Sequence, residues 1–345
     1  MPTRGGPRNL TRRTMTPPKP PPTISVALCT YNSGDYIDVQ LRSILDQDLP
    51  VTEVVVGDDG STDGTVDRIR AIAAEHPHGS VVRIAFTERA GGVVANFSRT
   101  LSACAGDVIA LSDHDDAWHP AKTATLVPRL TETGQRAMIF TDARLIDGDG
   151  EPTGRTLFEA YAVSDSELGA VREREAPSAL IRRNIVTGAT AMLTRDLLEP
   201  ALPIPDGFIH DEWLAFMAAT LGTLEVETTP LIDYRVHGSN QIGVPPSSLW
   251  GQVRVAMRAR RSRYGVLGGR ARVLRERLAH HVPPASEETL TLLDEKAAFE
   301  DARAHMPAFW PARLPGIFKR YRRGDYARFT HRPELERFRD LIQPM

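Results

Sequence analysis

The chain has 345 residues, of which 41% are hydrophobic, and a formal net charge of −2. This length is enough to bury the core of one large α/β domain, with or without a helical appendage. The balanced charge excludes a protein whose whole surface binds nucleic acid, and it also excludes an acidic tail protein. The two cysteines, Cys29 and Cys104, stand in apolar runs, which predicts buried residues in a reducing compartment.

The N-terminal segment, residues 1–22, is predicted to be a disordered basic arm, because it combines five basic residues with several prolines and has no acidic residue. It lacks the apolar core of a signal peptide, so export is not expected, and no later run has the length of a transmembrane helix. Residues 23–244 are predicted to form the main α/β domain. Residues 245–345, where arginines stand among Val, Leu and Met, predict a helical extension.

The first half of this domain alternates strand and helix patterns. Strands are predicted at 24–29, 53–56, 81–86 and 108–111. Apolar residues at helical spacing, such as Ile37 and Leu41, follow the first of them and predict intervening helices. This alternation predicts a mostly parallel, doubly wound sheet, in which ligands collect beyond the carboxyl ends of the strands.

The second half is less regular. Pro120 fits the first turn of a helix. Residues 137–146 predict one strand closed by a hairpin turn at Asp147–Gly150. A calcium loop is excluded there because Pro152 stands where such a loop needs glycine. Residues 151–180 are polar and predict a mobile loop. Further strands are predicted at 184–193, 224–228 and 230–236, with an apolar helix at 214–221.

Three carboxylates, Asp113, Asp115 and Asp116, crowd into four positions directly after the strand at 108–111. Like charges this close repel, so one of them must stay protonated or find a cation. Oxygen-rich clusters suit hard divalent ions such as Mg²⁺ or Mn²⁺. The alternative is a polar turn in which Asp116 caps the helix that follows.

Two more strand ends carry polar residues that fit a ligand-binding edge. Thr30 and Tyr31 follow the first strand, and Asp58 and Asp59 follow the second. The alternative is that the two aspartates only cap the helix after Gly64. Both interpretations can hold together, because one carboxylate can cap while the other binds.

In this combination the motifs closely resemble family 2 glycosyltransferases of the GT-A fold. The resemblance extends from about residue 24 to about residue 243 and rests on the segments Val26–Asn32, Val54–Thr65 and Asp113–Asp116. Three further segments narrow the resemblance to one bacterial branch of this family, which includes rhamnosyltransferases of cell-surface polysaccharides. They are Thr187–Thr190, His210–Trp213 and Tyr234–Asn240. The Gln-x-x-Arg-Trp motif of processive synthases is absent from the sequence, which favours transfer of a single sugar.

The resemblance implies a GT-A, Rossmann-like α/β fold and an inverting transferase that acts on a nucleoside diphosphate sugar. The expected donor is dTDP-L-rhamnose, followed by a UDP-hexose. The expected acceptor is a hydroxyl of a glycan or of a lipid-linked saccharide in cell-envelope polysaccharide synthesis. By the same resemblance Asp59 would bind the base or ribose, and Thr30 and Tyr31 would line that pocket.

The resemblance also assigns the chemistry. Asp113, Asp115 and Asp116 would form a DxD-type site, with Asp115 and Asp116 nearest to a Mg²⁺ or Mn²⁺ ion and to the diphosphate. Such an ion offsets the negative charge that develops on the leaving diphosphate. Asp211 matches the position of the family's general base, which takes the proton of the acceptor hydroxyl. Its alternative role is the N-cap of the helix at 213–221.

The remaining candidates flank these groups. Glu212 is the alternative base, Arg235 and His237 are placed near the diphosphate, and Thr187 and Gly188 are expected to border the acceptor. Trp213 is expected to stack on a sugar ring or to pack in the core, and the two uses stay open. Arg235 and His237 likewise have structural alternatives, because a single Arg or His at a strand end is often structural.

Two competing functions are a non-catalytic nucleotide-sugar-binding module and a nucleotidyltransferase. The joint presence of Asp115, Asp116 and Asp211 favours an enzyme over a binding module. A nucleotidyltransferase is expected to carry a glycine-rich basic loop after its first strand, whereas residues 30–35 contain no basic residue.

The arginine-rich C-terminal part has three interpretations: a solvated helical face, a surface that contacts anionic lipid, or a subunit interface of a homo-oligomer. Nucleic-acid binding is disfavoured, because no recognition motif accompanies the charge. The expected location is the cytoplasm, because the sequence shows neither a signal peptide nor a transmembrane run. Peripheral contact with the inner face of the membrane is the alternative.

Overall fold

The computed structural model of the protein describes residues 20–132, 136–236 and 260–343. The predictions for His237 and for nearly all of the basic arm lie outside these residues. The boundary expected at residue 244 lies outside them too, and it stays a prediction.

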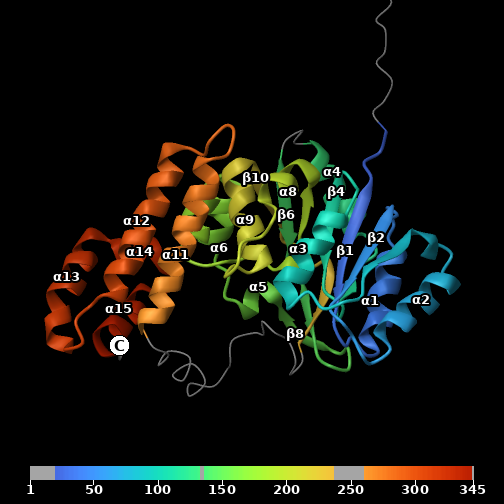
Figure 1. Ribbon diagram of the computed structural model, residues 1–345, viewed down its shortest axis with the longest axis horizontal. Coiled ribbons are helices and arrows are strands. Elements are labelled where there is room, and N and C mark those ends of the chain that lie inside the picture. The colour runs from blue at the N-terminus through green and yellow to red at the C-terminus, as the bar shows by residue number, and fades with distance from the viewer. Residues whose placement is uncertain (1–19, 133–135, 237–259, 344–345) are drawn as a thin grey trace, which may run out of the picture.

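A seven-stranded sheet forms the centre of the molecule, in the order β10-β6-β9-β4-β1-β2-β3 (Figure 1). Its strands are β1 (Ile24–Thr30), β2 (Glu53–Asp58), β3 (Val82–Phe86), β4 (Val108–Ser112), β6 (Ala137–Thr141), β9 (Met192–Thr194) and β10 (Thr223–Glu227). Neighbouring strands are parallel except at β9, which runs antiparallel to β4 and β6. The mostly parallel, doubly wound sheet is therefore confirmed.

Two buried clusters lie on the two faces of this sheet. Along β1, Val26 and Leu28 belong to one cluster and Ala27 and Cys29 to the other, as the two-residue period of a strand requires. The first face is covered by α1 (Tyr36–Leu45), α2 (Thr65–Glu75) and α4 (Lys122–Glu132), and the second by α3 (Val93–Ala103), α8 (Arg195–Ala201) and α9 (His210–Leu221). Because both faces are covered, every residue of β1 is buried. Cys29 and Cys104 are buried free thiols, as predicted.

The single strand predicted at 137–146 is wrong, because the chain leaves the main sheet after β6. The Asp142 carboxylate accepts the backbone N–H of Ala143 at 2.8 Å and that of Phe158 at 2.9 Å, and this local bonding breaks the strand. The chain then enters a second, four-stranded sheet in the order β5-β11-β7-β8. Its strands are β5 (Ala117–Trp118), β7 (Arg144–Ile146), β8 (Pro152–Thr156) and β11 (Ile232–Arg235). The predicted hairpin at Asp147–Gly150 joins the antiparallel strands β7 and β8.

The mobile loop predicted at 151–180 is also wrong. Three short helices follow β8: α5 (Leu157–Ala160), α6 (Asp165–Arg172) and α7 (Ala176–Leu180). Reciprocal capping boxes start two of them, one between Thr156 and Glu159 and one between Ser164 and Glu167. These Ser/Thr-x-x-Glu signals are present in the sequence, and the overall polarity of the segment concealed them.

The strand predicted at 184–193 is reduced to β9. The residues before it form an irregular segment and a short 3₁₀ turn, η2 (Gly188–Thr190). Side chains satisfy its backbone groups in place of a sheet ladder: Asn184 accepts the N–H of Val186 at 3.0 Å, and Lys122 donates to the carbonyl of Ala189 at 2.9 Å. The alternating apolar pattern therefore marks a buried loop beside the sheet, not a long strand.

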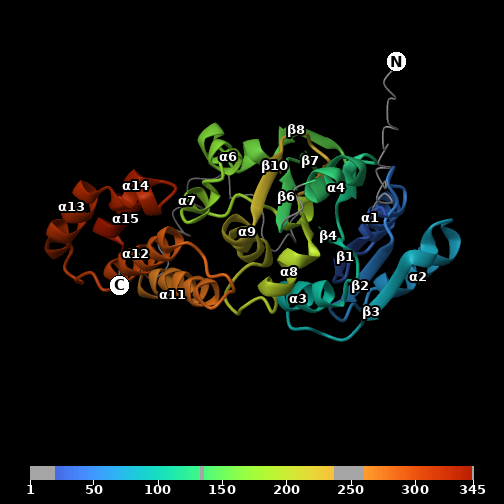
Figure 2. The ribbon, with the colours of Figure 1, turned by 90° about the horizontal axis from the view of Figure 1, so that it is seen from above.

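The C-terminal part is helical, as predicted. It contains α11 (Arg260–Ala279), α12 (Glu287–Ala304), α13 (Leu314–Arg323), α14 (Asp325–Phe329) and α15 (Pro333–Ile342), with a 3₁₀ turn at η3 (Trp310–Arg313). Figures 1 and 2 show these helices gathered at one end of the molecule, opposite α1 and α2. Arg303 is almost fully buried at their centre and donates to Asp340 at 2.9 Å and to Glu336 at 2.5 Å. Arg303 is therefore core, whereas Arg272 and Arg275 on α11 are about half exposed, as the interpretation of a solvated helical face requires.

Among the described residues, the longest helices carry too many charges to lie within the apolar interior of a membrane, and none qualifies as a spanning segment.

Candidate functional site

A cleft of about 700 Å³ opens beyond the carboxyl ends of β1, β2 and β4. This is the edge at which parallel α/β sheets bind ligands, and the volume is in the range of small-molecule sites. The predicted residues that line it together are Thr30, Tyr31, Asp59, Asp113, Asp115, Thr187, Gly188 and Asp211. Residues up to about 180 positions apart in sequence are thus brought to one cavity.

At one end of the cleft the two aspartates after β2 have different tasks. Asp58 accepts the Thr30 hydroxyl at 2.7 Å and the backbone N–H of Ser61 at 2.8 Å, which fixes the turn. Asp59 accepts the backbone N–H groups of Ala90, Gly91 and Gly92, which lie just before α3. Neither aspartate caps α2, so the capping alternative is wrong. Asp59 instead joins the turn after β2 to the loop before α3.

The same end carries an aromatic ring and a cation. The Tyr31 side chain is 41% exposed although it lines the cleft, so its ring is available to a ligand. The guanidinium of Arg89 lies 5.9 Å from the centre of that ring. Arg89 was not predicted from the sequence, where only the Gly91-Gly92 break indicated a loop at this point.

The acidic turn after β4 presents two of its three carboxylates to the cleft. Asp113 and Asp115 line the cavity, whereas Asp116 lies behind them, 1% exposed. Burial, followed by the charges of Asp115 and Asp211, raises the pKa of Asp113 to about 8. Burial and the neighbouring aspartates also raise the pKa of Asp116. One oxygen of Asp116 accepts the backbone N–H of Arg235 at 3.0 Å, and its other oxygen has no hydrogen-bond partner in the described part of the chain.

This donor set fits a hard divalent cation that is shared with a phosphate ligand. The described residues contain no group of three or more His, Cys, Asp or Glu side chains arranged to hold a metal ion alone. Mg²⁺ typically takes only one or two protein carboxylates and completes its shell with phosphate oxygens and water. Asp113 and Asp115 supply such a pair at the cleft surface. The placement therefore favours Asp113 over the predicted Asp116 as the partner of Asp115.

Arg235 holds the acidic turn in place, and this placement differs from the predicted one beside a phosphate. Its Nε donates to the carbonyl of Asp115 at 2.8 Å, and its Nη1 donates to the carbonyl of Asp147 at 3.1 Å. The guanidinium also stacks 4.7 Å from the centre of the Tyr36 ring. Arg235 thus ties the turn after β4 to the β7–β8 hairpin.

Asp211 enters the cleft from the first turn of α9. One of its oxygens accepts the Asn184 side-chain amide at 2.9 Å, and the other accepts the backbone N–H of Gly188 at 3.1 Å. The residue in the N-cap position is Ile209, so the alternative in which Asp211 caps this helix is wrong. Burial raises the pKa of Asp211 to about 7, although the hydrogen bonds from Gly188, Glu212 and Asn184 oppose that shift. A carboxylate titrating near neutral pH suits proton transfer.

The floor around Asp211 is closely packed. A Cβ placed on Gly188 would lie 2.5 Å from Nε2 of His210 and 3.6 Å from Cβ of Asp211, so only glycine fits there. The His210 ring stacks on Phe97 with 4.0 Å between centroids. Burial lowers the pKa of His210 to about 3, so this imidazole is neutral at physiological pH.

Two predicted acceptor residues lie elsewhere. Trp213 is fully buried, donates from Nε1 to the carbonyl of Ala201 at 2.7 Å and packs edge-on against Phe208. It belongs to the core, and its stacking on a sugar ring is excluded in this structure. Glu212 pairs with Arg270 at 2.9 Å and lines a second cavity, so it is turned away from the cleft.

Sequence reasoning missed several cleft residues: Tyr36, Arg89, Tyr161, Asn184, His210 and Tyr234. Asn184 could have been suspected from the sequence. Asparagine bonds readily to nearby backbone groups and is rare in strands, which argues against the strand predicted at 184–193. Tyr161 lies in the segment that was predicted to be a loop. His210 and Tyr234 stand in segments that carried the family resemblance, whereas nothing local distinguishes Tyr36 and Arg89 from ordinary surface residues.

Comparisons with known proteins agree with this architecture. The family model described as glycosyl transferase family 2 matches residues 25–199. An uncharacterised glycosyltransferase of Nostoc sp. is 25% identical over 63% of this chain and 66% of its own length. The dTDP-rhamnosyl transferase RfbG of Shigella flexneri is 24% identical over 63% of this chain and 73% of its own length. With several other curated relatives the alignment spans only 52% of their length.

Among solved structures, the Staphylococcus aureus protein TarS, residues 1–349 in complex with UDP-GlcNAc, superimposes with a TM-score of 0.53. The match has 18% sequence identity and covers 81% of this chain and 72% of that one. At this identity the likeness establishes the fold, which is the expected GT-A type.

Proposed function

The chain belongs to glycosyl transferase family 2, and from its cleft we propose that it transfers one sugar, with inversion, from a nucleoside diphosphate sugar to an acceptor hydroxyl. The observation that carries the proposal is the meeting of Asp113, Asp115 and Asp211 in one cavity with Tyr31 and Asp59. A site for a leaving diphosphate, a candidate base and a nucleotide-sized recess are the three parts that direct displacement needs.

The donor nucleotide is assigned to the end of the cleft formed by β1, β2 and the loop before α3. Tyr31 offers a ring for stacking on the base, Thr30 and Asp59 border the same recess, and Arg89 supplies positive charge beside it. RfbG is named a dTDP-rhamnosyl transferase, and TarS was solved with UDP-GlcNAc. We therefore keep dTDP-L-rhamnose as the first donor to test and a UDP-hexose as the second.

Asp113 and Asp115 are the residues that would hold Mg²⁺ or Mn²⁺ together with the donor diphosphate. A bound divalent ion would supply positive charge against the leaving oxygens, which is worth most in a site with little water. Burial first, and then the charges of Asp115 and Asp211, raise the pKa of Asp113, so its ionised form is costly without a cation.

Asp211 is assigned as the general base. Asn184 and the Gly188 N–H fix its carboxylate. It takes the proton from the acceptor hydroxyl while the oxygen attacks the anomeric carbon from the face opposite the diphosphate. One bond forms as the bond to the diphosphate breaks, so the configuration inverts. Thr187 and Gly188, which line the cleft beside Asp211, are assigned to the acceptor.

Nucleotide titration tests the proposal. In calorimetry with dTDP, UDP and GDP, we expect one nucleotide to bind, and to bind at least tenfold more tightly with Mn²⁺ than in EDTA. Tyr31→Ala should weaken that binding about tenfold, because stacking of a base on an aromatic ring contributes about 1–3 kcal/mol. Tyr321→Ala on α13 is the matched control and should leave it unchanged. The absence of nucleotide binding under every condition would reject the proposal.

A membrane location is proposed from the surface of α13. The exposed apolar residues are Phe309 and Trp310 at the start of η3, just before this helix, and Leu314, Phe318 and Tyr321 of α13 itself. Four basic residues, Lys319, Arg320, Arg322 and Arg323, share this helix. Aromatic and basic residues on one amphipathic helix suit the interface of an anionic bilayer. The acceptor would then be lipid-linked and reached at the inner face of the cell membrane.

Vesicle sedimentation checks this surface. The full chain should sediment with vesicles containing phosphatidylglycerol and much less with vesicles of phosphatidylcholine alone. The double variant Phe318→Ser/Tyr321→Ser should reduce sedimentation several-fold. The paired control Val39→Ser/Val266→Ser removes equally exposed apolar groups elsewhere, and an equal loss in the control would contradict the assignment.

A further inference from the structure

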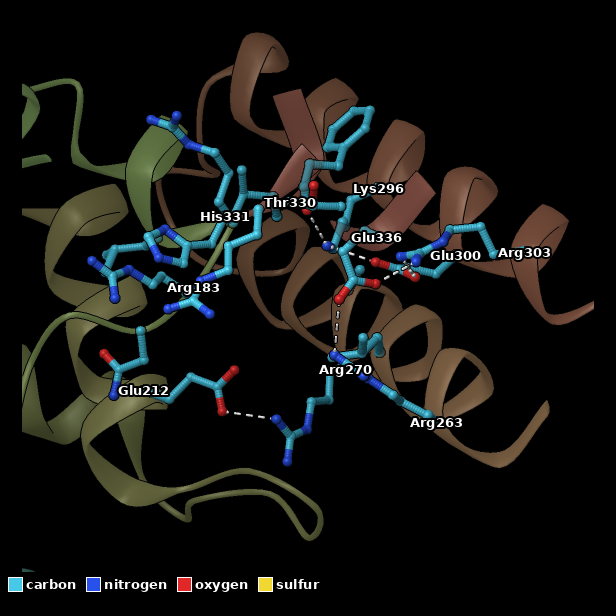
Figure 3. A pocket seen from close by; sticks show the side chains of 18 of the residues that line it. Arg183, Glu212, Arg263, Arg270, Lys296, Glu300, Arg303, Thr330, His331 and Glu336 are labelled. Atoms are coloured by element: carbon cyan, nitrogen blue, oxygen red, sulfur yellow. Dashed lines mark hydrogen bonds and ion pairs between the residues drawn. The ribbon is translucent and has the colours of Figure 1, made fainter. Parts of the chain in front are cut away.

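A second cavity, of about 360 Å³, lies between α7 and α9 of the catalytic fold and the C-terminal helices α11, α12 and α15 (Figure 3). None of the steps proposed above uses it. Eight arginine and lysine side chains line it against three glutamates, and His331, one of the residues between α14 and α15, lines it as well. The cavity is partly open, since Arg182 is half-buried and Arg332 is exposed, so a ligand from solvent can reach these charges.

The deeper part of this basic cavity is balanced. Arg303 contacts Glu300, Glu336 and Asp340, and Lys296 pairs with Glu300 at 2.7 Å. These side chains are buried and bonded to one another, and Figure 3 shows Lys296, Glu300, Arg303 and Glu336 on the C-terminal helices. They form a structural network that holds α12 and α15 together.

The part nearer the catalytic fold carries the excess. Arg182 and Arg332 form no ion pair with an acidic side chain of the described residues, and Nε of Arg270 is buried without a hydrogen-bond partner among them. Arg183 is paired with Glu167 at 2.7 Å beside them. Burial, followed by the charges of Arg183, Arg332 and Arg182, lowers the pKa of His331, which records the positive potential.

This basic cavity adjoins the catalytic cleft. Asn184 lines both of them, and its side chain donates to Asp211 at 2.9 Å. The consecutive residues Asp211 and Glu212 face opposite ways, the first into the cleft and the second into the basic cavity, where it pairs with Arg270. A ligand held by the basic cavity would therefore lie next to the catalytic cleft, because Glu212 in the cavity wall directly follows the candidate base Asp211 in the chain.

We propose that the basic cavity binds a phosphate or diphosphate group carried by the acceptor, so that the acceptor hydroxyl reaches Asp211. This inference rests on the proposed transferase function. Arginine is the side chain best suited to phosphate, because its planar fork donates two parallel hydrogen bonds. Apolar residues of the same wall, such as Phe208, Phe216 and Leu274, provide room for the hydrocarbon part of a lipid diphosphate.

Titration of the full chain with inorganic pyrophosphate in EDTA tests the cavity. Without a divalent ion the carboxylates of the catalytic cleft repel the anion, although Arg89 lines the same cleft. Binding is therefore assigned to the basic cavity by its loss in a variant of that cavity. The wild type is expected to bind one pyrophosphate. The double variant Arg182→Gln/Arg332→Gln should bind it at least tenfold more weakly, because two charge-assisted contacts are lost. The control Arg42→Gln/Arg70→Gln, with the same charge change on α1 and α2, should bind as the wild type does.

A parallel titration with farnesyl diphosphate distinguishes the source of the group. Tighter binding than pyrophosphate would support a lipid-linked diphosphate, and equal binding would support a phosphate borne by a glycan. No pyrophosphate binding by the wild type, or unchanged binding by the Arg182/Arg332 variant, would overturn the inference. Nucleotide binding with Mn²⁺, measured on the same samples, reports the donor cleft separately and so distinguishes failure of this inference from failure of the transferase function.

Discussion

Replacing Asp211 by asparagine is expected to lower kcat about a thousandfold while nucleotide binding stays within twofold of the wild type. Asparagine keeps the size of the side chain and one accepting oxygen, but its NH2 group cannot accept the hydrogen bond that Asn184 or Gly188 donates to the second oxygen, and it cannot take the hydroxyl proton. Loss of a positioned general base typically costs about 10²–10⁴ in rate. Initial rates of sugar transfer, paired with calorimetric nucleotide binding, measure both quantities, and a native rate in the variant would refute the assignment.

The pH dependence of the wild type gives an independent check on Asp211. Burial raises the pKa of Asp211 to about 7, so its basic form is depleted below that pH. The rate is therefore expected to fall about tenfold for each pH unit below 7 and to level off above it. A pH profile of kcat between pH 5.5 and 8.5 measures this, and a profile that is flat below pH 7 would contradict the role.

A second variant separates the placement of Asp211 from its chemistry. Gly188→Ala introduces a methyl group 2.5 Å from Nε2 of His210, which must displace that ring, whereas its 3.6 Å separation from Cβ of Asp211 is ordinary contact. A shift of His210 moves the start of α9, which carries Asp211. We expect kcat to fall at least tenfold with the Asp211 carboxylate still present. Gly169→Ala on α6 is the matched control, because a Cβ there meets nothing within 4 Å, and it should leave kcat unchanged.

Replacing Asp113 by asparagine is expected to abolish Mn²⁺-dependent turnover and, at high pH in EDTA, to raise the melting temperature by several degrees. Burial and the charges of Asp115 and Asp211 raise the pKa of Asp113 to about 8, against about 3.9 in an unfolded chain. Protonated Asp113 contributes its full stabilisation of the folded state below about pH 4. This contribution is lost as the pH rises through 8. Asparagine carries no charge, so its variant avoids that loss.

Calorimetric melting at pH 6 and pH 9, in EDTA and in Mn²⁺, measures the effect. The variant should melt above the wild type at pH 9 and much closer to it at pH 6, whereas Mn²⁺ should stabilise only the wild type. Asp206→Asn, at an exposed position, is the control and should shift neither curve. A variant that melts below the wild type at pH 9 would show that the ionised Asp113 carboxylate does not destabilise the folded protein. Sites that trade stability for activity in this way are common in enzymes.

Much of the site was predictable because strands and their ends leave local signals. Apolar runs placed β1, β2 and β4, and the parallel alternation put Thr30, Asp59 and Asp113 at one edge before any coordinates were known. Asp211 was found through the family resemblance and not from its own surroundings. Its neighbours in sequence give no sign that Asn184 and Gly188 would hold it.

The sequence by itself determined the fold class, the edge of the sheet that binds ligands and the carboxylates gathered there, because hydrophobic periodicity and strand ends are local properties. Only the tertiary structure decided that Asp113 and not Asp116 faces the cleft, that Trp213 is core, and that Glu212 turns toward Arg270. Which side of a turn or helix meets a cavity depends on packing against distant segments. The basic cavity shows this most clearly, because its walls come from α7, α9 and helices that follow them by up to about 150 residues.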